Sequence, residues 1–266
     1  MSAPLLTYFD LAIASFLVLL NAALSFLLNL GLGRALILAA ARATVQLLLV
    51  GLILKSVFAS SSLVIMLAVA ALMIALASYE VWSRQKQRFA AGWSIGIGAC
   101  ATTGAAVLVL LFAIVNLRSA SWREPEVFIP FVGIILGSVM NGVSISLNVF
   151  NTGLTRERAA IEAQLALGAT RSEALKPLQR NALRSGLIPI VNQMSAAGII
   201  TLPGLMTGQI LAGMAPFEAA KYQILVLFLL AGGAGLGALA ATSLALWRAT
   251  DGRHRLRPDR LAPPSS

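Results

Sequence analysis

Long apolar runs recur along almost the whole chain and leave few folds open to it. Of its 266 residues, 58% are hydrophobic and 11% are charged, whereas soluble domains carry about 25% charged residues. Apolar runs of about 18 residues or more are long enough to cross a bilayer as helices. Open sheets are excluded, since lipid offers the backbone no hydrogen-bond partner. We therefore predict an all-α, polytopic integral membrane protein.

The hydropathy pattern indicates about seven spans, which together form a transmembrane domain over residues 1–247 and leave a basic tail at 248–266. The first apolar run has no basic segment before it and no small-residue cleavage signature, so we expect it to be retained as a span. The expected spans are 8–30, 35–58, 61–80, 93–116, 127–150, 187–213 and 221–247.

Positive charge orients these spans. When alternate connections are assigned to one side, that side holds 15 of the 20 Lys and Arg residues: one at Arg34, three in 84–88, six in 155–184 and five in the tail. Because cytoplasmic loops are enriched in Lys and Arg, we expect a cytoplasmic (inner) membrane protein with its N-terminus outside and its C-terminus in the cytosol. The tail is expected to be mobile and to touch anionic lipid. This one-sided distribution argues against nucleic-acid binding, despite a net charge of +10.

One polar stretch, residues 155–184, separates two strongly apolar halves of the chain. It predicts an amphipathic helix, a left-handed turn at Gly168 and a second helix that opens with a capping box at Thr170 and Glu173. Pro177 is expected to kink or shorten that second helix. We interpret this coupling segment (residues 155–184) as a cytosolic helix-turn-helix surface for a soluble partner. The alternative is an amphipathic helix that lies on the membrane surface.

The coupling segment resembles the "EAA loop" of ABC-transporter permeases, which inserts a short helix into a groove on the ATP-binding subunit. The resemblance rests on Glu162-Ala163, on Gly168 six positions after the Glu, and on the Ala-Thr and Glu-Ala pairs that follow. The usual Ile-x-Leu-Pro ending is absent. The residues that this resemblance implies for ATPase coupling are Arg158, Glu162, Leu165, Gly168, Thr170 and Glu173.

Longer motifs resemble the FetB-type permease family, which includes bacterial iron-export permeases and plant aluminium-tolerance permeases. The resemblance runs from about Arg42 to Gln223 and implies a membrane subunit that pairs with a separate ATPase to export a substrate, iron or another metal ion. The plant relatives, associated also with nucleotide-sugar transport, leave the substrate open. The motifs are Arg42-Ala-Thr-Val-Gln46-Leu, Leu136-Gly137-Ser-Val-Met140-Asn141-Gly142, Leu165-Ala-Leu-Gly-Ala-Thr170, Pro189-Ile-Val-Asn192-Gln193-Met194 and Leu202-Pro203-Gly204-Leu-Met206-Thr207-Gly208-Gln209-Ile-Leu-Ala-Gly213.

Polar groups within the expected spans predict a translocation path. Pro203-Gly204 should break the sixth span, which is tolerated at membrane depth where protein or water covers the backbone; a simple packing kink is the alternative. Asn141, Ser144 and Asn148 form a stripe on the fifth span, which would line the path or hydrogen-bond to other helices. The candidate path residues are Arg42, Gln46, Glu80, Asn141, Asn148, Asn192, Gln193, Pro203, Gly204, Met206 and Gln209.

Charged and metal-ligating residues are few within the spans. We expect Arg42 and Glu80 to pair with each other, or Glu80 to offer an oxygen ligand to a cation; the alternative is that they reach to the interface. The metal site is unknown, because the single Cys100 and the single His254 form no cluster of ligands. Methionine thioethers could bind a soft metal ion, but the alternative role of these methionines is to fill gaps in the core. The metal candidates are Glu80, Met140, Met194 and Met206.

The chain lacks a G-x-x-x-x-G-K-[ST] phosphate-binding loop and any Ser/His/Asp set in its apolar body. We therefore expect a transport subunit rather than an enzyme, with no cofactor bound directly and ATP bound by a partner ABC ATPase. One chain supplies one coupling segment while ATP sites in such machines come in pairs, so a homodimer in the lipid bilayer is expected. The alternative is a self-sufficient secondary transporter driven by an ion gradient.

Overall fold

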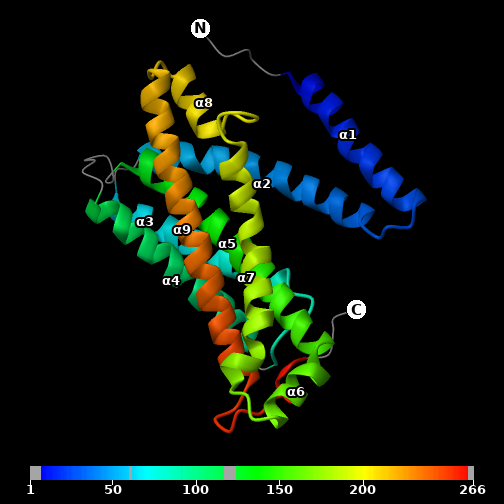
Figure 1. The fold of residues 1–266 in the computed structure, drawn as a ribbon. Helices are drawn as coiled ribbons and strands as arrows, with labels where there is room; N and C mark the ends of the chain where they lie inside the picture. The colour runs from blue at the N-terminus through cyan, green and yellow to red at the C-terminus, as the bar shows by residue number, and fades with distance from the viewer. Residues whose placement is uncertain (1–6, 60–61, 91, 117–123, 263–266) are drawn as a thin grey trace. The chain divides into compact units, whose positions relative to one another are not determined.

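The computed structural model describes residues 7–59, 62–90, 92–116 and 124–262 (Figure 1). These ranges are almost entirely helical, and the described residues contain isolated β-bridges but no strand. The helices are α1 (Tyr8–Leu27), α2 (Gly33–Ala59), α3 (Leu63–Ser83), α4 (Trp93–Asn116), α5 (Pro125–Arg156), α6 (Arg158–Ala166), α7 (Arg171–Ala196), α8 (Gly204–Leu211), α9 (Pro216–Ala249) and the 3-10 helix η2 (Pro258–Arg260). The chain divides into two compact units, Met1–Ser62 and Leu63–Ser266.

The first unit is a helical hairpin of α1 and α2. Thr7 and Asp10 form a capping box that opens α1, and the connection between the helices passes through Asn29 and Gly31, both at positive φ. Gly33 packs against the backbone of Ala22, where a Cβ would approach the Ala22 carbonyl oxygen to 2.9 Å. A small residue is therefore required where this hairpin closes.

The second unit is organised around α5 and α9, which pack against each other and against α4 and α7. The larger buried side chains come from α5, whereas α9 contributes mainly Gly and Ala. At Gly237 an added Cβ would lie 2.9 Å from both Val139 and Val143. Small residues that let helix backbones approach closely are typical of packing between membrane helices, so this core is of the membrane type.

Six described helices are long and apolar enough to span a membrane: α1, α2, α3, α4, α5 and α9. This confirms a polytopic, all-α membrane protein. The expected sixth span, 187–213, differs in the structure, where it is divided between the end of α7 and the short α8. The interruption falls where Pro203-Gly204 predicts it, with Pro203 as the N-cap of α8.

Helix α7 differs from the expectation at its other end. It begins at Arg171 in the coupling segment and continues without interruption to Ala196, with both Pro177 and Pro189 inside it. Pro177 therefore does not shorten the helix. Each internal proline costs one backbone hydrogen bond, but packing against α5 and α9 holds α7 together. One helix thus joins two regions that the hydropathy pattern separates.

Candidate functional site

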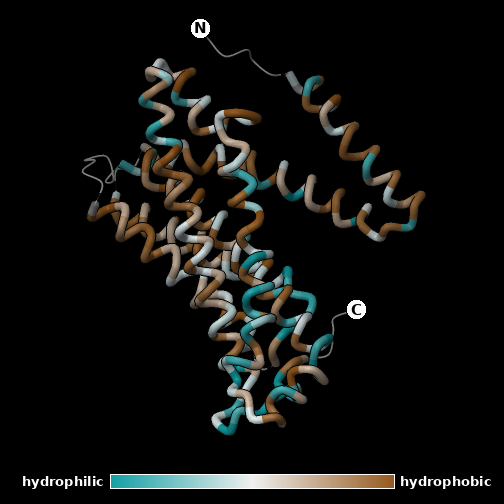
Figure 2. The backbone as a smooth tube through the Cα atoms, viewed as in Figure 1, coloured by the Kyte–Doolittle hydropathy of each residue, from teal (hydrophilic) through white to brown (hydrophobic). Residues whose placement is uncertain are grey.

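Three polar segments meet at one end of the Leu63–Ser266 unit, where Figure 2 shows hydrophilic residues gathered. They are the loop 84–90, the coupling segment and residues 250–262, which we call the C-terminal strap. The Ala262 N–H donates to the Arg88 carbonyl oxygen at 2.7 Å, and the Ala90 N–H donates to the Arg260 carbonyl oxygen at 2.8 Å. Three basic segments predicted to share one side of the membrane therefore lie together, and we call this region the polar end. Its orientation towards the cytosol stays a prediction.

The coupling segment has the predicted helix-turn-helix form. Helix α6 closes at Gly168, whose φ of +93° is the left-handed conformation that favours glycine. The Thr170 hydroxyl then accepts a hydrogen bond from the Glu173 N–H at 3.3 Å, and the Glu173 carboxylate accepts one from the Thr170 N–H at 2.8 Å. On α6, Arg158 and Glu162 form an exposed ion pair at 2.8 Å. The turn is thus determined by contacts between residues close together in the sequence.

The apolar residues of this turn divide into an inner and an outer set. Leu154 and Ile161 are buried and Leu165 is half-buried, so these three face the bundle. Leu167, next to the turn, is 89% exposed. The sequence analysis selected Leu165 and missed Leu167. The position of Leu167 directly before the closing Gly168 was a signal that could have indicated an exposed residue. The apolar group offered at the tip of the segment is Leu167.

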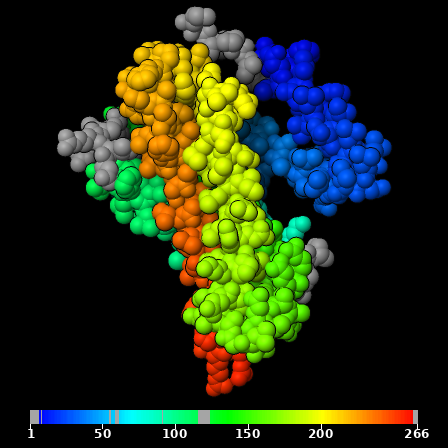
Figure 3. Space-filling view, viewed as in Figure 1, coloured from blue at the N-terminus to red at the C-terminus, as the bar shows by residue number. Residues whose placement is uncertain are grey.

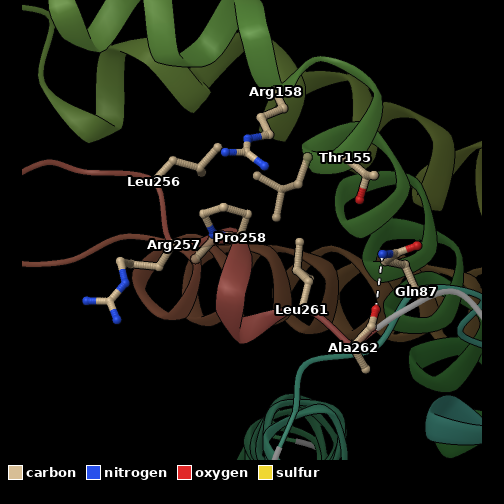
Figure 4. Close-up of a pocket in the computed structure, with 10 residues that line it drawn as sticks. Gln87, Thr155, Arg158, Leu256, Arg257, Pro258, Leu261 and Ala262 are labelled. Atoms are coloured by element: carbon tan, nitrogen blue, oxygen red, sulfur yellow. Dashed lines mark hydrogen bonds between the residues drawn. The ribbon is translucent and has the colours of Figure 1, made fainter.

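The C-terminal strap lies against the coupling segment, and the two enclose a cavity of about 360 Å³ (Figure 4). Thr155 and Arg158 line it from one side, with Leu256, Pro258 and Leu261 of the strap on the other. Residues 250–262 are therefore docked against the bundle, while their expected mobility stays a prediction; the expectation for 263–266 lies outside the described residues.

Two further contacts hold the strap. The Arg171 N–H at the start of α7 donates to His254 Nδ1 at 3.2 Å. Arg260 Nη1 donates to the carbonyl oxygens of Arg248 at 2.9 Å and Thr250 at 3.1 Å, where α9 ends. The strap thus links the start of α7 to the end of α9.

A testable consequence concerns the capping box. Thr170→Ala should lower hydrogen-exchange protection in residues 171–174 by about fivefold at neutral pH, because a first-turn donor of α7 loses its acceptor. Hydrogen bonds from the Thr170 backbone and hydroxyl lower the pKa of Glu173. The stabilisation that the Glu173 carboxylate gives to the capping box is therefore present above the ordinary pKa of Glu173. It is lost as the pH falls through the lowered pKa, so the difference in protection between the wild type and Thr170→Ala should narrow in acid. Protection factors at both pH values measure this, and Ser172→Ala, which should match the wild type, is the control.

A cleft of about 230 Å³ lies between α5, α7 and α9. It brings together Asn141 of the predicted stripe and Gln193 of the predicted sixth span. These are two of the candidate path residues, and no Asp or Glu is among the described residues that line the cleft. Its lining is Gly133, Ile134, Gly137, Ser138, Asn141, Gly142, Gly186, Pro189, Ile190, Gln193, Leu230 and Ala234.

The rest of the polar stripe of α5 has another role. Asn148 Oδ1 accepts a hydrogen bond from the Lys86 N–H at 3.1 Å, which fastens the loop 84–90 to α5. Ser144 is buried, and its hydroxyl makes no hydrogen bond within the described residues. The stripe is therefore divided: Asn141 lines the cleft, whereas Asn148 bonds to a loop and not, as the alternative interpretation had it, to another helix.

Arg84 is a cleft neighbour that sequence reasoning missed. It forms an ion pair with Glu80 at 3.2 Å, and its Nη1 donates to Asn141 Oδ1 at 3.3 Å. Glu80 is thus paired one helical turn away, and its pairing with Arg42 stays a prediction. Arg42 and Gln46 both lie on exposed positions of α2 in the first unit. The spacing of four residues between Glu80 and Arg84 was the signal that could have indicated this pair.

The remaining candidate residues lie outside the cleft lining. Asn192 is exposed on α7, while Pro203 and Gly204 open α8, which also carries Met206 and Gln209. None of Met140, Met194 and Met206 is among the residues that line the cleft. In the described ranges, no three His, Cys, Asp or Glu side chains gather as a metal site. The metal candidates therefore do not form one site with the cleft.

Comparison with known proteins gives a consistent result. A family model described as an uncharacterised protein family, UPF0014, matches residues 8–249. The membrane protein slr1647 of Synechocystis is 36% identical over 80% of this chain and 82% of its own length. The probable iron export permease protein FetB of Escherichia coli is 31% identical over 96% of this chain and 97% of its own length. The protein ALUMINUM SENSITIVE 3 of Arabidopsis thaliana is 29% identical over 88% of this chain and 84% of its own length. No solved structure matches the chain significantly.

Proposed function

Because the chain belongs to the UPF0014 family, we propose that it is the membrane permease subunit of an ATP-driven exporter whose ATPase is a separate protein. Iron, or another metal ion, is the proposed substrate, because a relative that aligns with almost the whole chain is named a probable iron export permease. The permease works in the cytoplasmic membrane as a homodimer with two ATPase subunits. Its polar end faces the cytosol, and ATP binds only to the partner.

The observation that carries this proposal is the continuity of α7. The helix starts at the capping box beside Gly168 and also carries Pro189 and Gln193, which line the cleft. From Arg171 to Gln193 an α-helix rises about 33 Å. Closure of the ATPases would push on the coupling segment, and α7 would pass this displacement to the cleft as a single body.

Transport by inverted membrane vesicles tests the proposal. Vesicles that contain this chain and a co-expressed Walker-type ATPase from the same organism should accumulate labelled iron when ATP is added. Vesicles with the chain alone should stay near background, since the chain has no phosphate-binding loop of its own. Iron uptake by the chain alone, driven by a proton gradient, would instead establish the secondary transporter.

A further inference from the structure

Three cations form a ladder along one face of α7. Lys176, Arg180 and Arg184 are spaced four residues apart, so that they lie one above the other on successive turns of the helix. All three are exposed. Together with Glu173, Pro177 and Asn181 they line a groove on the surface of the Leu63–Ser266 unit. Figure 3 shows α7, in yellow-green, on that surface.

This ladder takes no part in holding the bundle together. The face of α7 that packs against its neighbours carries Leu175, Leu178, Ala182 and Gly186, which are buried on the opposite side of the helix. Within the described residues, no salt bridge joins any of the three cations to a carboxylate. The one acid in the groove, Glu173, accepts hydrogen bonds from the N–H and hydroxyl of Thr170, and Lys176 acts on it only as a nearby charge.

The spacing itself is unfavourable without a ligand. Like charges four residues apart repel each other and destabilise a helix, and here two such pairs follow one another. An anionic phosphate group placed against the groove would reduce this repulsion. It would also accept hydrogen bonds from two guanidinium groups, whose planar donor geometry fits phosphate oxygens.

The position of the ladder indicates where that anion comes from. Below it α7 starts in the coupling segment at the polar end, and above it α7 lines the cleft among membrane helices. The ladder occupies the stretch in which α7 passes from its charged part to its apolar part. Lipid phosphates lie at this level of a membrane, and basic residues there attract anionic headgroups.

We propose that Lys176, Arg180 and Arg184 form a binding site for a phosphate-bearing anion, supplied by the headgroup of an anionic lipid of the cytosolic leaflet. Occupation of the site offsets part of the positive charge on the lower half of α7. It thereby stabilises the helix that joins the coupling segment to the cleft. The three cations belong to the α7 part of the coupling segment, away from its tip at Leu167, and their place at the cytosolic leaflet rests on the proposed function. Lipid binding is measured without ATPase and without transport, so it can fail while the proposed function stands.

Equilibrium binding to the full-length protein in neutral dodecyl maltoside micelles tests the site. The probe is a fluorescent dioctanoyl phosphatidylglycerol, with the corresponding phosphatidylcholine as the neutral lipid. The wild type should bind the anionic probe saturably and the neutral one hardly at all. Arg180→Gln/Arg184→Gln should weaken binding by about 30-fold, since each basic residue near an anionic headgroup contributes about fivefold.

The strap supplies a matched control. Arg253→Gln/Arg255→Gln removes the same two charges from exposed positions of the same polar end, and its affinity should stay within about twofold of the wild type. Arg180→Lys/Arg184→Lys, which keeps both charges, should lose less affinity than Arg180→Gln/Arg184→Gln. An unchanged Tm of that glutamine variant excludes a folding defect. Equal losses in the two glutamine variants, or no loss in either, would overturn the site.

A second arm distinguishes the two sources of phosphate. Inorganic pyrophosphate is added without lipid, and its binding is followed by the shift in Tm. If pyrophosphate at millimolar concentration fails to bind while the lipid binds through the ladder, the headgroup source is established. The opposite outcome is that pyrophosphate binds and displaces the lipid, with both effects lost in Arg180→Gln/Arg184→Gln. In that outcome the anion site stands, but its ligand is a solute and the lipid assignment is overturned.

Discussion

Replacement of Leu167 by Asp is expected to abolish capture of the partner ATPase. Leu167 is the apolar group at the tip of the coupling segment, and it is 89% exposed beside the left-handed turn at Gly168. Truncation of an interface hot spot costs about 2–4 kcal/mol, and we expect Leu167 to be one. Its loss, with a charge left in the interface, should weaken binding by about 30-fold or more. The measurement is copurification of the co-expressed ATPase on the tagged permease.

Two controls make this result specific. Leu167→Met keeps an apolar side chain of similar volume and should retain the ATPase. The Tm of the purified Leu167→Asp protein should equal that of the wild type, because the side chain has almost no contacts to lose. If Leu167→Asp retains the ATPase as well as the wild type does, Leu167 does not anchor the partner and the docking assignment needs another residue.

Replacement of Gly186 by Ala should destabilise the bundle more than an ordinary glycine substitution. Gly186 lies where α7 crosses α5, and a Cβ there would collide with Ser146 Oγ and lie 2.7 Å from the Gly142 carbonyl oxygen. A Cβ added at Gly142 would in turn lie 3.0 Å from the carbonyl oxygen of Ala234 in α9. Three helices are thus in near-backbone contact beside the cleft. Such overpacking costs about 1–3 kcal/mol and should lower the Tm measured in detergent.

Gly232 offers the matched control for this substitution. It is also a glycine inside a long helix of the same unit, but an added Cβ there would meet nothing within 4 Å. Gly232→Ala should leave the Tm unchanged or raise it, since alanine favours a helix over glycine by about 1 kcal/mol. Should Gly186→Ala prove as stable as Gly232→Ala, the close α5–α7 crossing is wrong.

Local sequence information was sufficient for most of the secondary structure. The long apolar runs predicted the membrane helices because a chain in lipid must satisfy its backbone within each segment. Gly168, Thr170 and Glu173 predicted the turn and capping box of the coupling segment, since these contacts span only a few residues. The interruption at Pro203-Gly204 was predicted for the same reason.

The candidate site was predicted only in part. Asn141 and Gln193 were both selected as path residues, and the structure places them in one cleft. Arg84 was missed because its hydrogen bond to Asn141 joins positions 57 residues apart. Leu165 was named from the loop resemblance, whereas the structure shows Leu165 half-buried on α6 and Leu167, at the C-cap of this helix, exposed.

The chain's hydropathy and local turn signals determine a helical membrane protein with a hinged polar segment, because these properties depend on neighbouring residues alone. Two features needed long-range packing. The strap is held by bonds such as that from Ala262 to Arg88, and composition cannot distinguish a docked basic tail from a free one. The continuity of α7 through Pro177 and Pro189 contradicts local propensity. It exists because contacts with α5 and α9 compensate for the missing backbone hydrogen bonds.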